Sequence, residues 1–337
     1  MTQMLDFSGF LNLPLIFGGV LALAIFLYVL LDGFDLGVGI LFPFAPSDEC
    51  RSKMMNSVAP FWDGNETWLV LGGGGLLAAF PLAYSIIMPT FYIPIILMLL
   101  GLIFRGVAFE FRFKTTSRNE QKIWDYSFHF GSLIAAFFQG VMLGSFIQGV
   151  DAGNRWNWLN AFSLMTGIAM IFGYALIGST WLIMKTHGKT QDWARHVAYY
   201  VLTFVAFFIA LVSIWTPFLN EQISDRWFAV PNIFYLAVIP VLTFVTLICL
   251  IRSLLAKKEV QPFCLTIFLF VLCYAGLAVT LFPYAIPYQV TFENAAASPQ
   301  SLSFLFVGVA IILPVILCYT AFSYWVFRGK ASHEKMY

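Results

Sequence analysis

The chain has 337 residues, of which 60% are hydrophobic, 18% aromatic and only 10% charged. Soluble domains carry about 25% charged residues, so this composition excludes an ordinary soluble protein and indicates an integral membrane protein. The net charge of +1 says little, because the distribution of charge matters here rather than its sum; no nucleic-acid partner is expected. The first ten residues lack the basic region of a cleavable signal, so we expect the first apolar run to remain as a helix.

Apolar runs long enough to cross a bilayer, about 20 residues each, recur along the whole chain. They predict nine membrane helices in an all-α integral membrane protein, at about residues 11–42, 67–88, 91–111, 124–148, 159–184, 196–217, 229–251, 262–283 and 302–327. The connections between them are short, which leaves no room for a soluble domain.

The basic residues indicate how these helices are oriented. With an external N-terminus, only Arg155 and Arg226 lie on the outer side. The other sixteen of the eighteen lie at the inner side: Arg51, Lys53, Arg105, Arg112, Lys114, Arg118, Lys122, Lys185, Lys189, Arg195, Arg252, Lys257, Lys258, Arg328, Lys330 and Lys335. This is the positive-inside pattern, and it predicts a periplasmic N-terminus and a cytoplasmic C-terminus.

Ionisable residues within the predicted helices gather in the first four of them. The stretch LDGFDLGVGILFPF places Asp32 and Asp35 three residues apart, on one helix face. FWDGNETW then places Asp63 and Glu66 at the start of the second predicted helix. The remaining members of the set lie at the inner ends of the third and fourth: Arg105, Glu110, Asp125 and His129.

Carboxylates in membrane segments are costly, and an ion or proton path is the usual reason for keeping them. Because all eight residues belong to the cytoplasmic half, they predict a hydrated polar cavity that opens to the inner face. Asp32, Asp35 and Asp63 are the candidates for proton relay or water coordination, with Arg105 as the charge partner and His129 as a secondary polar member.

Each residue also has a plainer interpretation. Asp63 or Asn65 is suited to capping a helix. Glu110 and Asp125 are suited to pairing with Arg112 and Lys122 at the membrane surface, or to being solvated. Arg105 is expected to neutralise a neighbouring acid.

No catalytic or metal-binding motif is present in the sequence. The five cysteines show no paired spacing, and the four that lie in apolar runs are interpreted as small buried side chains, so neither a disulfide nor a metal site is expected. His129 is the one histidine well inside a predicted helix, and a bis-histidine haem needs two facing imidazoles. A polar or pH-responsive role is therefore the better interpretation of His129.

Five segments together resemble subunit II of the cytochrome bd-type quinol oxidases, most closely the cyanide-insensitive branch. They are DGFDLGVGILFPF, NSVAPFWDGNETWLV, FRGVAFEFR, WDYSFHFGS and the terminal LPVILCYTAFSYWVFRGK. By motif, Asp32 and Asp35 correspond to the DGFD acids, Asp63 to the WDGN acid, Arg105 to the FR arginine and Asp125 to the WD acid. His129 follows four residues after that acid, and Glu110 stands where some relatives have Asp.

The resemblance implies a subunit of a terminal oxidase in the bacterial inner membrane, which oxidises quinol and reduces dioxygen to water with cytoplasmic protons. It implies haems, two b-type and one d-type or a b-type substitute, in the partner subunit I and none in this chain. The implied fold is two four-helix bundles, residues 11–148 and 159–283, with a peripheral ninth helix at 302–327. A structural quinone, membrane lipids and a small single-helix accessory subunit are further expected partners.

Two other functions remain open at this stage. A proton- or ion-coupled secondary transporter would also use membrane carboxylates, although it would place them near the midplane, often within inverted repeats. A purely structural scaffold would use its acids only to pair with basic residues.

Overall fold

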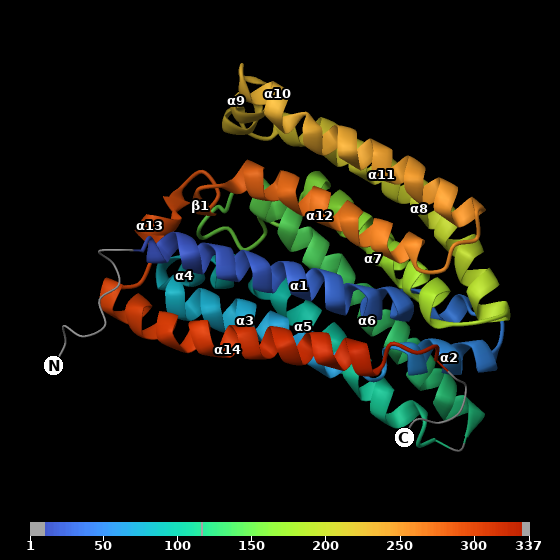
Figure 1. The fold of residues 1–337 in the computed structure, drawn as a ribbon. Helices are drawn as coiled ribbons and strands as arrows, with labels where there is room; N and C mark the ends of the chain where they lie inside the picture. Colours follow the sequence, from blue (N-terminus) through green and yellow to red (C-terminus); the bar gives the residue numbers. More distant parts are fainter. Residues whose placement is uncertain (1–10, 116, 332–337) are drawn as a thin grey trace.

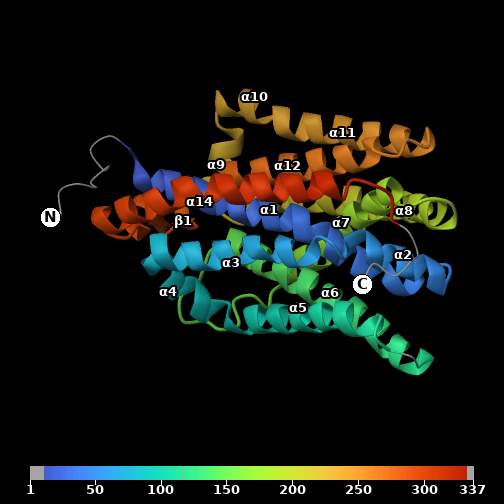
Figure 2. The same ribbon diagram turned by 60° about the horizontal axis from the view of Figure 1, so that its bottom comes forward.

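The computed structural model describes residues 11–115 and 117–331, and long helices that run roughly side by side dominate it (Figure 1, Figure 2). The first half contains α1 (Leu13–Leu41), η1 (Phe42–Phe44), α2 (Asp48–Val58), α3 (Trp62–Ala79), α4 (Pro81–Thr90), α5 (Tyr92–Arg112), α6 (Arg118–Gln148) and α7 (Ala161–Lys185). The second half contains α8 (Lys189–Trp215), η2 (Thr216–Phe218), α9 (Glu221–Phe228), α10 (Asn232–Leu236), α11 (Val238–Leu255), α12 (Gln261–Leu281), β1 (Tyr284–Ile286), β2 (Val290–Thr291), α13 (Phe292–Ala295) and α14 (Pro299–Val326).

Helix α1 lies at the centre of the helices and packs against α3, α6 and α7 (Figure 1). Its contact with α7 brings backbone against backbone at Gly37 and Gly178. A Cβ atom on Gly37 would lie 1.8 Å from the carbonyl oxygen of Tyr174. Small residues permit such close approach between membrane helices, so the α1–α7 contact requires glycine here.

Eight helices of the described chain are long and apolar enough to cross a membrane, and eight of the nine predicted segments each overlap one of them. The exception is 67–88, where the structure has α3 and α4 in place of one helix. Phe80, between them, has φ −133° and ψ 63°. Proline disfavours helical backbone in the residue before it, which explains the break before Pro81.

Helices α1 and α14 run in the same direction. At one end, Asn12 beside α1 and Leu302 of α14 line the same pocket. At the other end, Asn65 of α3 bonds the backbone of α1 and the Tyr324 hydroxyl of α14. Helix α3 runs in the opposite direction between these ends, because Ala79, near its end, accepts a backbone hydrogen bond from the segment before α14.

Short elements cover the two ends of the bundle. Strands β1 and β2 form an antiparallel hairpin beside α13 at the end where α1 and α14 begin, which we call the hairpin end (Figure 1). Helix α2 lies at the opposite end, which we call the α2 end (Figure 1). The sequence prediction leaves this segment as a connection between its first two helices, whereas the structure makes it a helix capped by Ser47, with Asp48 and Glu49 in its first turn.

Candidate functional site

Three charged side chains from three helices meet in the apolar interior toward the α2 end. Arg105 of α5 donates through Nη1 to Asp32 Oδ1 of α1 at 2.5 Å, and through Nη2 to Glu66 Oε1 of α3. The side chains of Arg105 and Asp32 are fully buried, whereas 28% of the Glu66 side chain is exposed. The prediction that Arg105 neutralises a neighbouring acid is confirmed, and its partners are these two carboxylates.

A fourth polar residue, Asp35, lies one turn further along α1 and is also fully buried. Its Oδ2 accepts a hydrogen bond of 2.7 Å from Asn65 Nδ2, and the Tyr324 hydroxyl donates to Asn65 Oδ1 at 2.9 Å. Asn65 therefore holds Asp35 and α14 together. It is not the N-cap of α3, because Phe61 occupies that position, and Asp63 lies in the first turn instead.

The buried carboxylate cluster, by which we mean Asp32, Asp35, Glu66 and Arg105, has three carboxyls and one cation. Burying net negative charge is costly, and one guanidinium balances one carboxylate. Asp32 Oδ2 and Asp35 Oδ1 accept no hydrogen bond from the described residues. The cluster therefore has both the acidic groups and the free acceptor atoms needed to hold exchangeable protons.

The sequence analysis missed a chain of three uncharged residues beside Asp32. Tyr174 of α7 donates to Gln139 Oε1 of α6 at 2.6 Å, and Gln139 Nε2 donates to the Tyr28 hydroxyl of α1 at 2.8 Å. Both tyrosines are buried. The one available sequence signal is that Tyr28 precedes Asp32 by four residues, which places both on one helix face.

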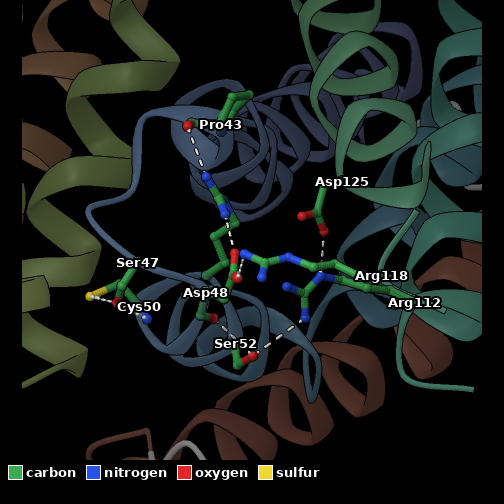
Figure 3. Close-up of polar contacts among 9 residues, drawn as sticks. Pro43, Ser47, Asp48, Cys50, Ser52, Arg112, Arg118 and Asp125 are labelled. Carbon is green, nitrogen blue, oxygen red and sulfur yellow. Dashed lines mark hydrogen bonds and ion pairs between the residues drawn. The ribbon is translucent and has the colours of Figure 1, made fainter. Parts of the chain in front are cut away.

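A second polar group lies nearer the α2 end (Figure 3). Arg112 Nε donates to Asp125 Oδ1 at 2.6 Å, and Arg112 Nη1 lies 3.4 Å from the Ser52 hydroxyl of α2. Arg118 donates to Asp48 of α2 at 3.0 Å. Asp125 therefore pairs with Arg112, as its plainer interpretation proposes, and this group fastens α2 to α5 and α6 rather than joining the buried cluster.

Besides Asp125, three residues of the predicted set lie outside the buried cluster. Asp63 is exposed on α3, although Glu66 follows it by one turn. Glu110 is exposed and pairs with Lys114. His129 is half-buried, with Nδ1 3.3 Å from the Gly39 carbonyl oxygen. Helix rotation separates these residues from the buried cluster, so the structure brings four of the eight together, and a cavity shared by all eight stays a prediction.

The buried cluster is also more enclosed than predicted. Aromatic rings pack next to it at the α2 end: Phe34 stacks on Trp181 with centroids 4.0 Å apart, and Phe61 stacks on Tyr324 at 4.5 Å. These rings lie on the side where the sequence predicts an opening to the inner face. Glu66 is the one member of the cluster whose side chain reaches the surface of the described chain.

Metal binding finds no support in the side chains. Among residues 11–115 and 117–331, no group of three or more His, Cys, Asp or Glu side chains is placed to hold a metal ion.

Comparisons with known proteins place this geometry in a family. The model of cytochrome bd terminal oxidase subunit II matches residues 13–327. Cytochrome bd ubiquinol oxidase subunit 2 of Bacillus subtilis is 30% identical over 323 residues, which cover 91% of this chain and 94% of that protein. Cytochrome bd-I ubiquinol oxidase subunit 2 of Escherichia coli K12 is 28% identical over 348 residues, with 91% and 92% coverage.

A solved structure shares the fold. The bd oxidase of Geobacillus thermodenitrificans contains a chain that superposes with a TM-score of 0.76 at 17% identity, over 94% of this chain and 99% of that one. The all-helical membrane architecture is therefore that of a bd oxidase subunit. Together with the match over residues 13–327, this means that the chain belongs to the cytochrome bd terminal oxidase subunit II family and is a membrane subunit of a bd-type terminal oxidase.

Proposed function

We propose that this chain is the haem-free subunit of a bd-type quinol oxidase and gives protons from the cytoplasm a route to the haem-bearing subunit I. In that enzyme quinol is oxidised and dioxygen is reduced to water. The names of the Bacillus subtilis and Escherichia coli relatives support quinol as the electron donor. The chain also stabilises subunit I by packing against it.

The observation that carries the proton route is the buried carboxylate cluster. Glu66, whose carboxylate is partly exposed, exchanges protons at the surface that faces subunit I, and Asp32, bound to the other end of the Arg105 guanidinium, is a second proton-holding group behind it. Arg105 keeps its charge, so it orients the two carboxylates while the protons reside on the acids and on intervening water. Asp35, which forms no ion pair with a cation in the described residues, is a third proton-holding group.

The outward face of α3 is the proposed docking surface for subunit I. Its exposed residues follow helical spacing and include a charge and a hydroxyl: Asp63, Thr67, Val70, Gly74 and Leu77. A charged side chain facing lipid is costly, so a protein partner is the better neighbour for Asp63. A Cβ atom on Gly74 would meet nothing within 4 Å, which leaves room for a closely packed helix. A partner on this face would also cover the exposed edge of Glu66.

We propose nine membrane crossings, with α3 and α4 together forming the second. Because α1 and α14 run in the same direction, the number of crossings from first to last is odd, which supports nine rather than eight. With nine crossings the positive-inside pattern places the N-terminus in the periplasm and the C-terminus in the cytoplasm of the inner membrane. The proposed division remains two four-helix bundles, residues 11–148 and 159–283, with α14 peripheral.

Membership in an oxidase family argues against the secondary transporter. An experiment is needed to decide between a purely structural scaffold and the proton route. The test replaces Asp32 with Asn and Glu66 with Gln in the assembled oxidase and measures oxygen consumption per haem. We expect each change to slow turnover by about tenfold or more while haem spectra persist, as for lost proton-transfer groups. Glu110→Gln is the control, because that carboxylate is exposed and its ion pair is with Lys114 on the same helix surface.

Each outcome distinguishes the two roles. Lower turnover per haem in both variants, with the control unchanged, supports the proton route. Normal turnover per haem with less assembled enzyme supports the scaffold role and removes the proton route.

A further inference from the structure

The uncharged chain beside Asp32 has no place in the proton route described so far. It links three helices: Tyr174 of α7, Gln139 of α6 and Tyr28 of α1. Gly33, the residue after Asp32, makes room for it, because a Cβ atom there would lie 2.8 Å from the Tyr174 ring. The Tyr174 ring therefore packs directly against the segment of α1 that carries Asp32.

The hydrogen bonds along this chain have a fixed direction. The Tyr174 hydroxyl donates to the Gln139 carbonyl, which turns the Gln139 amide nitrogen toward Tyr28 as a donor. Because the Tyr28 oxygen accepts that bond, its own hydrogen is free to be donated elsewhere. Tyr28 interacts with the Asp32 carboxyl group one turn away on the same helix.

Asp32 has an oxygen atom that needs a hydrogen-bond donor. Its Oδ1 is held by Arg105, whereas its Oδ2 accepts no hydrogen bond from the described residues. The Tyr28 hydroxyl, which interacts with this carboxyl group, carries the free hydrogen that Oδ2 lacks. The opposite amide orientation of Gln139 would make Tyr28 donate to Gln139 and would turn its lone pairs toward the Asp32 carboxylate, which is electrostatically unfavourable.

We propose that Tyr28 is a positioning residue for Asp32, with its hydroxyl oriented by Gln139 and, through Gln139, by Tyr174. This inference rests on the proposed proton route, and it identifies the residue that positions the Asp32 carboxyl group within that route. The chain does not extend the route itself. A neutral amide gives and takes hydrogen bonds but does not readily pass on a proton, so proton transfer stops at Gln139.

The groups that face Asp32 come from every neighbouring helix and define what a pH measurement reports. They are Arg105 of α5, Glu66 of α3, Tyr174 of α7, Tyr324 of α14, and Tyr28 and Asp35 of α1. Removal of the Tyr28 hydroxyl takes away one donor to the charged form of Asp32 and leaves the other groups in place. The pH dependence of turnover then changes even where the fold does not.

The test uses the assembled oxidase with Tyr28→Phe, which removes the hydroxyl and keeps the ring. We expect oxygen consumption per haem to fall by about three- to tenfold, the effect of one lost hydrogen bond, together with a displaced pH profile. Gln139→Leu, which leaves Tyr28 and Asp32 intact, is expected to displace the profile in the same direction. Tyr274→Phe is the matched control, because the Tyr274 hydroxyl also bonds within this bundle but donates to the Ala22 carbonyl, away from Asp32.

A double variant separates this inference from the proton route. In an Asp32→Asn background, Tyr28→Phe is expected to change turnover by less than about twofold, because residues that act through one another are not additive. If Asp32→Asn alone leaves turnover unchanged, the proton route fails. If Asp32→Asn slows turnover but Tyr28→Phe changes neither the rate nor the pH profile, or if the two effects are additive, only the positioning role of Tyr28 is overturned.

Discussion

Arg105 and Asp32 are 73 positions apart in sequence, yet the guanidinium and carboxylate meet at 2.5 Å with both side chains fully buried. The pair joins α5 to α1, and Glu66 adds α3 through the second guanidinium nitrogen. A buried charge without its partner is much costlier than the pair. The same contact therefore holds three helices together and keeps two carboxylates in the bilayer interior.

Replacement of Arg105 by Leu is predicted to destabilise the subunit strongly. It leaves Asp32 and Glu66 without their cation, and breaking a buried pair in this way costs about 3–5 kcal/mol. Thermal denaturation and the yield of haem-containing enzyme measure the effect. Arg118→Ala is the control, because the Arg118–Asp48 pair is 75% and 54% exposed and such pairs contribute about 1 kcal/mol or less. Equal effects of the two changes would contradict this account.

Asp35→Asn is predicted to be tolerated structurally. No ion pair in the described residues joins Asp35 to a cation, so the change removes no charge partner. Asparagine has the same shape and can still accept the hydrogen bond from Asn65. We expect a change in stability within about 1 kcal/mol, in contrast to Asp35→Leu, which leaves Asn65 without an acceptor at about 1–3 kcal/mol. Thermal denaturation of both variants is the measurement. Similar losses of stability in Asp35→Asn and Asp35→Leu would contradict this prediction.

That buried acids would meet an arginine here was predictable from the sequence. Which of the acids would do so was not. Burial of an acid in an apolar segment demands a compensating charge, which is why Arg105 was expected to pair. Asp63 and Glu66 are three residues apart on one helix, yet Asp63 is exposed and Glu66 lies against Arg105. The rotation of α3 about its own axis decides this difference, and packing against α1 sets that rotation. No local pattern contains this information.

The break between α3 and α4 and the start of α2 both have signals in the local sequence, which a count of apolar residues does not detect. Pro81 disfavours helix at Phe80, so the division of the second predicted helix follows from one residue. Ser47 followed by two acids is a typical helix start and marks α2. Gln139 and Tyr174 have no such local signal. The hydrogen-bond partner of a single polar group in an apolar helix depends on how the helices pack.

Gly37→Ala is predicted to disrupt the α1–α7 contact. The added Cβ atom would lie 1.8 Å from a backbone oxygen, and backbone cannot move aside as a flexible side chain does. We expect a loss of at least about 1–3 kcal/mol, typical of overpacking, and a lower yield of assembled enzyme. Gly19→Ala on the same helix is the control. An added Cβ atom there meets nothing within 4 Å, so the change is expected to be neutral or to stabilise α1 by about 0.5–1 kcal/mol.

Arg112→Ala is predicted to loosen α2 from the bundle. Arg112 is 1% exposed, pairs with Asp125 and lies over the Phe42 ring at 5.2 Å. Its loss removes a largely buried ion pair between α5 and α6 together with the contact to Ser52 of α2, so we expect a destabilisation of about 2–4 kcal/mol that includes α2. Hydrogen exchange of the α2 amides measures this. Lys114→Ala, which breaks an exposed pair four residues apart, is expected to leave α2 exchange unchanged; faster exchange in both variants would contradict the local role of Arg112.

The contact between Lys330 and Glu259 is predicted to depend on pH. Lys330 Nζ donates to Glu259 Oε2 at 2.8 Å and, together with bonds to the carbonyls of Thr186 and Lys185, helps to hold the segment after α14 beside the α11–α12 loop. This hydrogen bond lowers the pKa of Glu259 below its usual value of 4.5. A lowered carboxylate pKa means that the contact stabilises the docked segment above about pH 4.5 and is lost as pH falls through the lowered pKa.

The measurement is the distance between spin labels placed at Lys258→Cys and Ala331→Cys in a cysteine-free background, followed from neutral to acidic pH. We expect a narrow distance distribution at neutral pH that broadens in acid, because protonated Glu259 no longer attracts the Lys330 ammonium. In a Glu259→Gln background the distribution should be broad at every pH, since the amide carries no charge to titrate. An unchanged acid transition in that background would assign it to another group and remove Glu259 as the pH-sensitive contact.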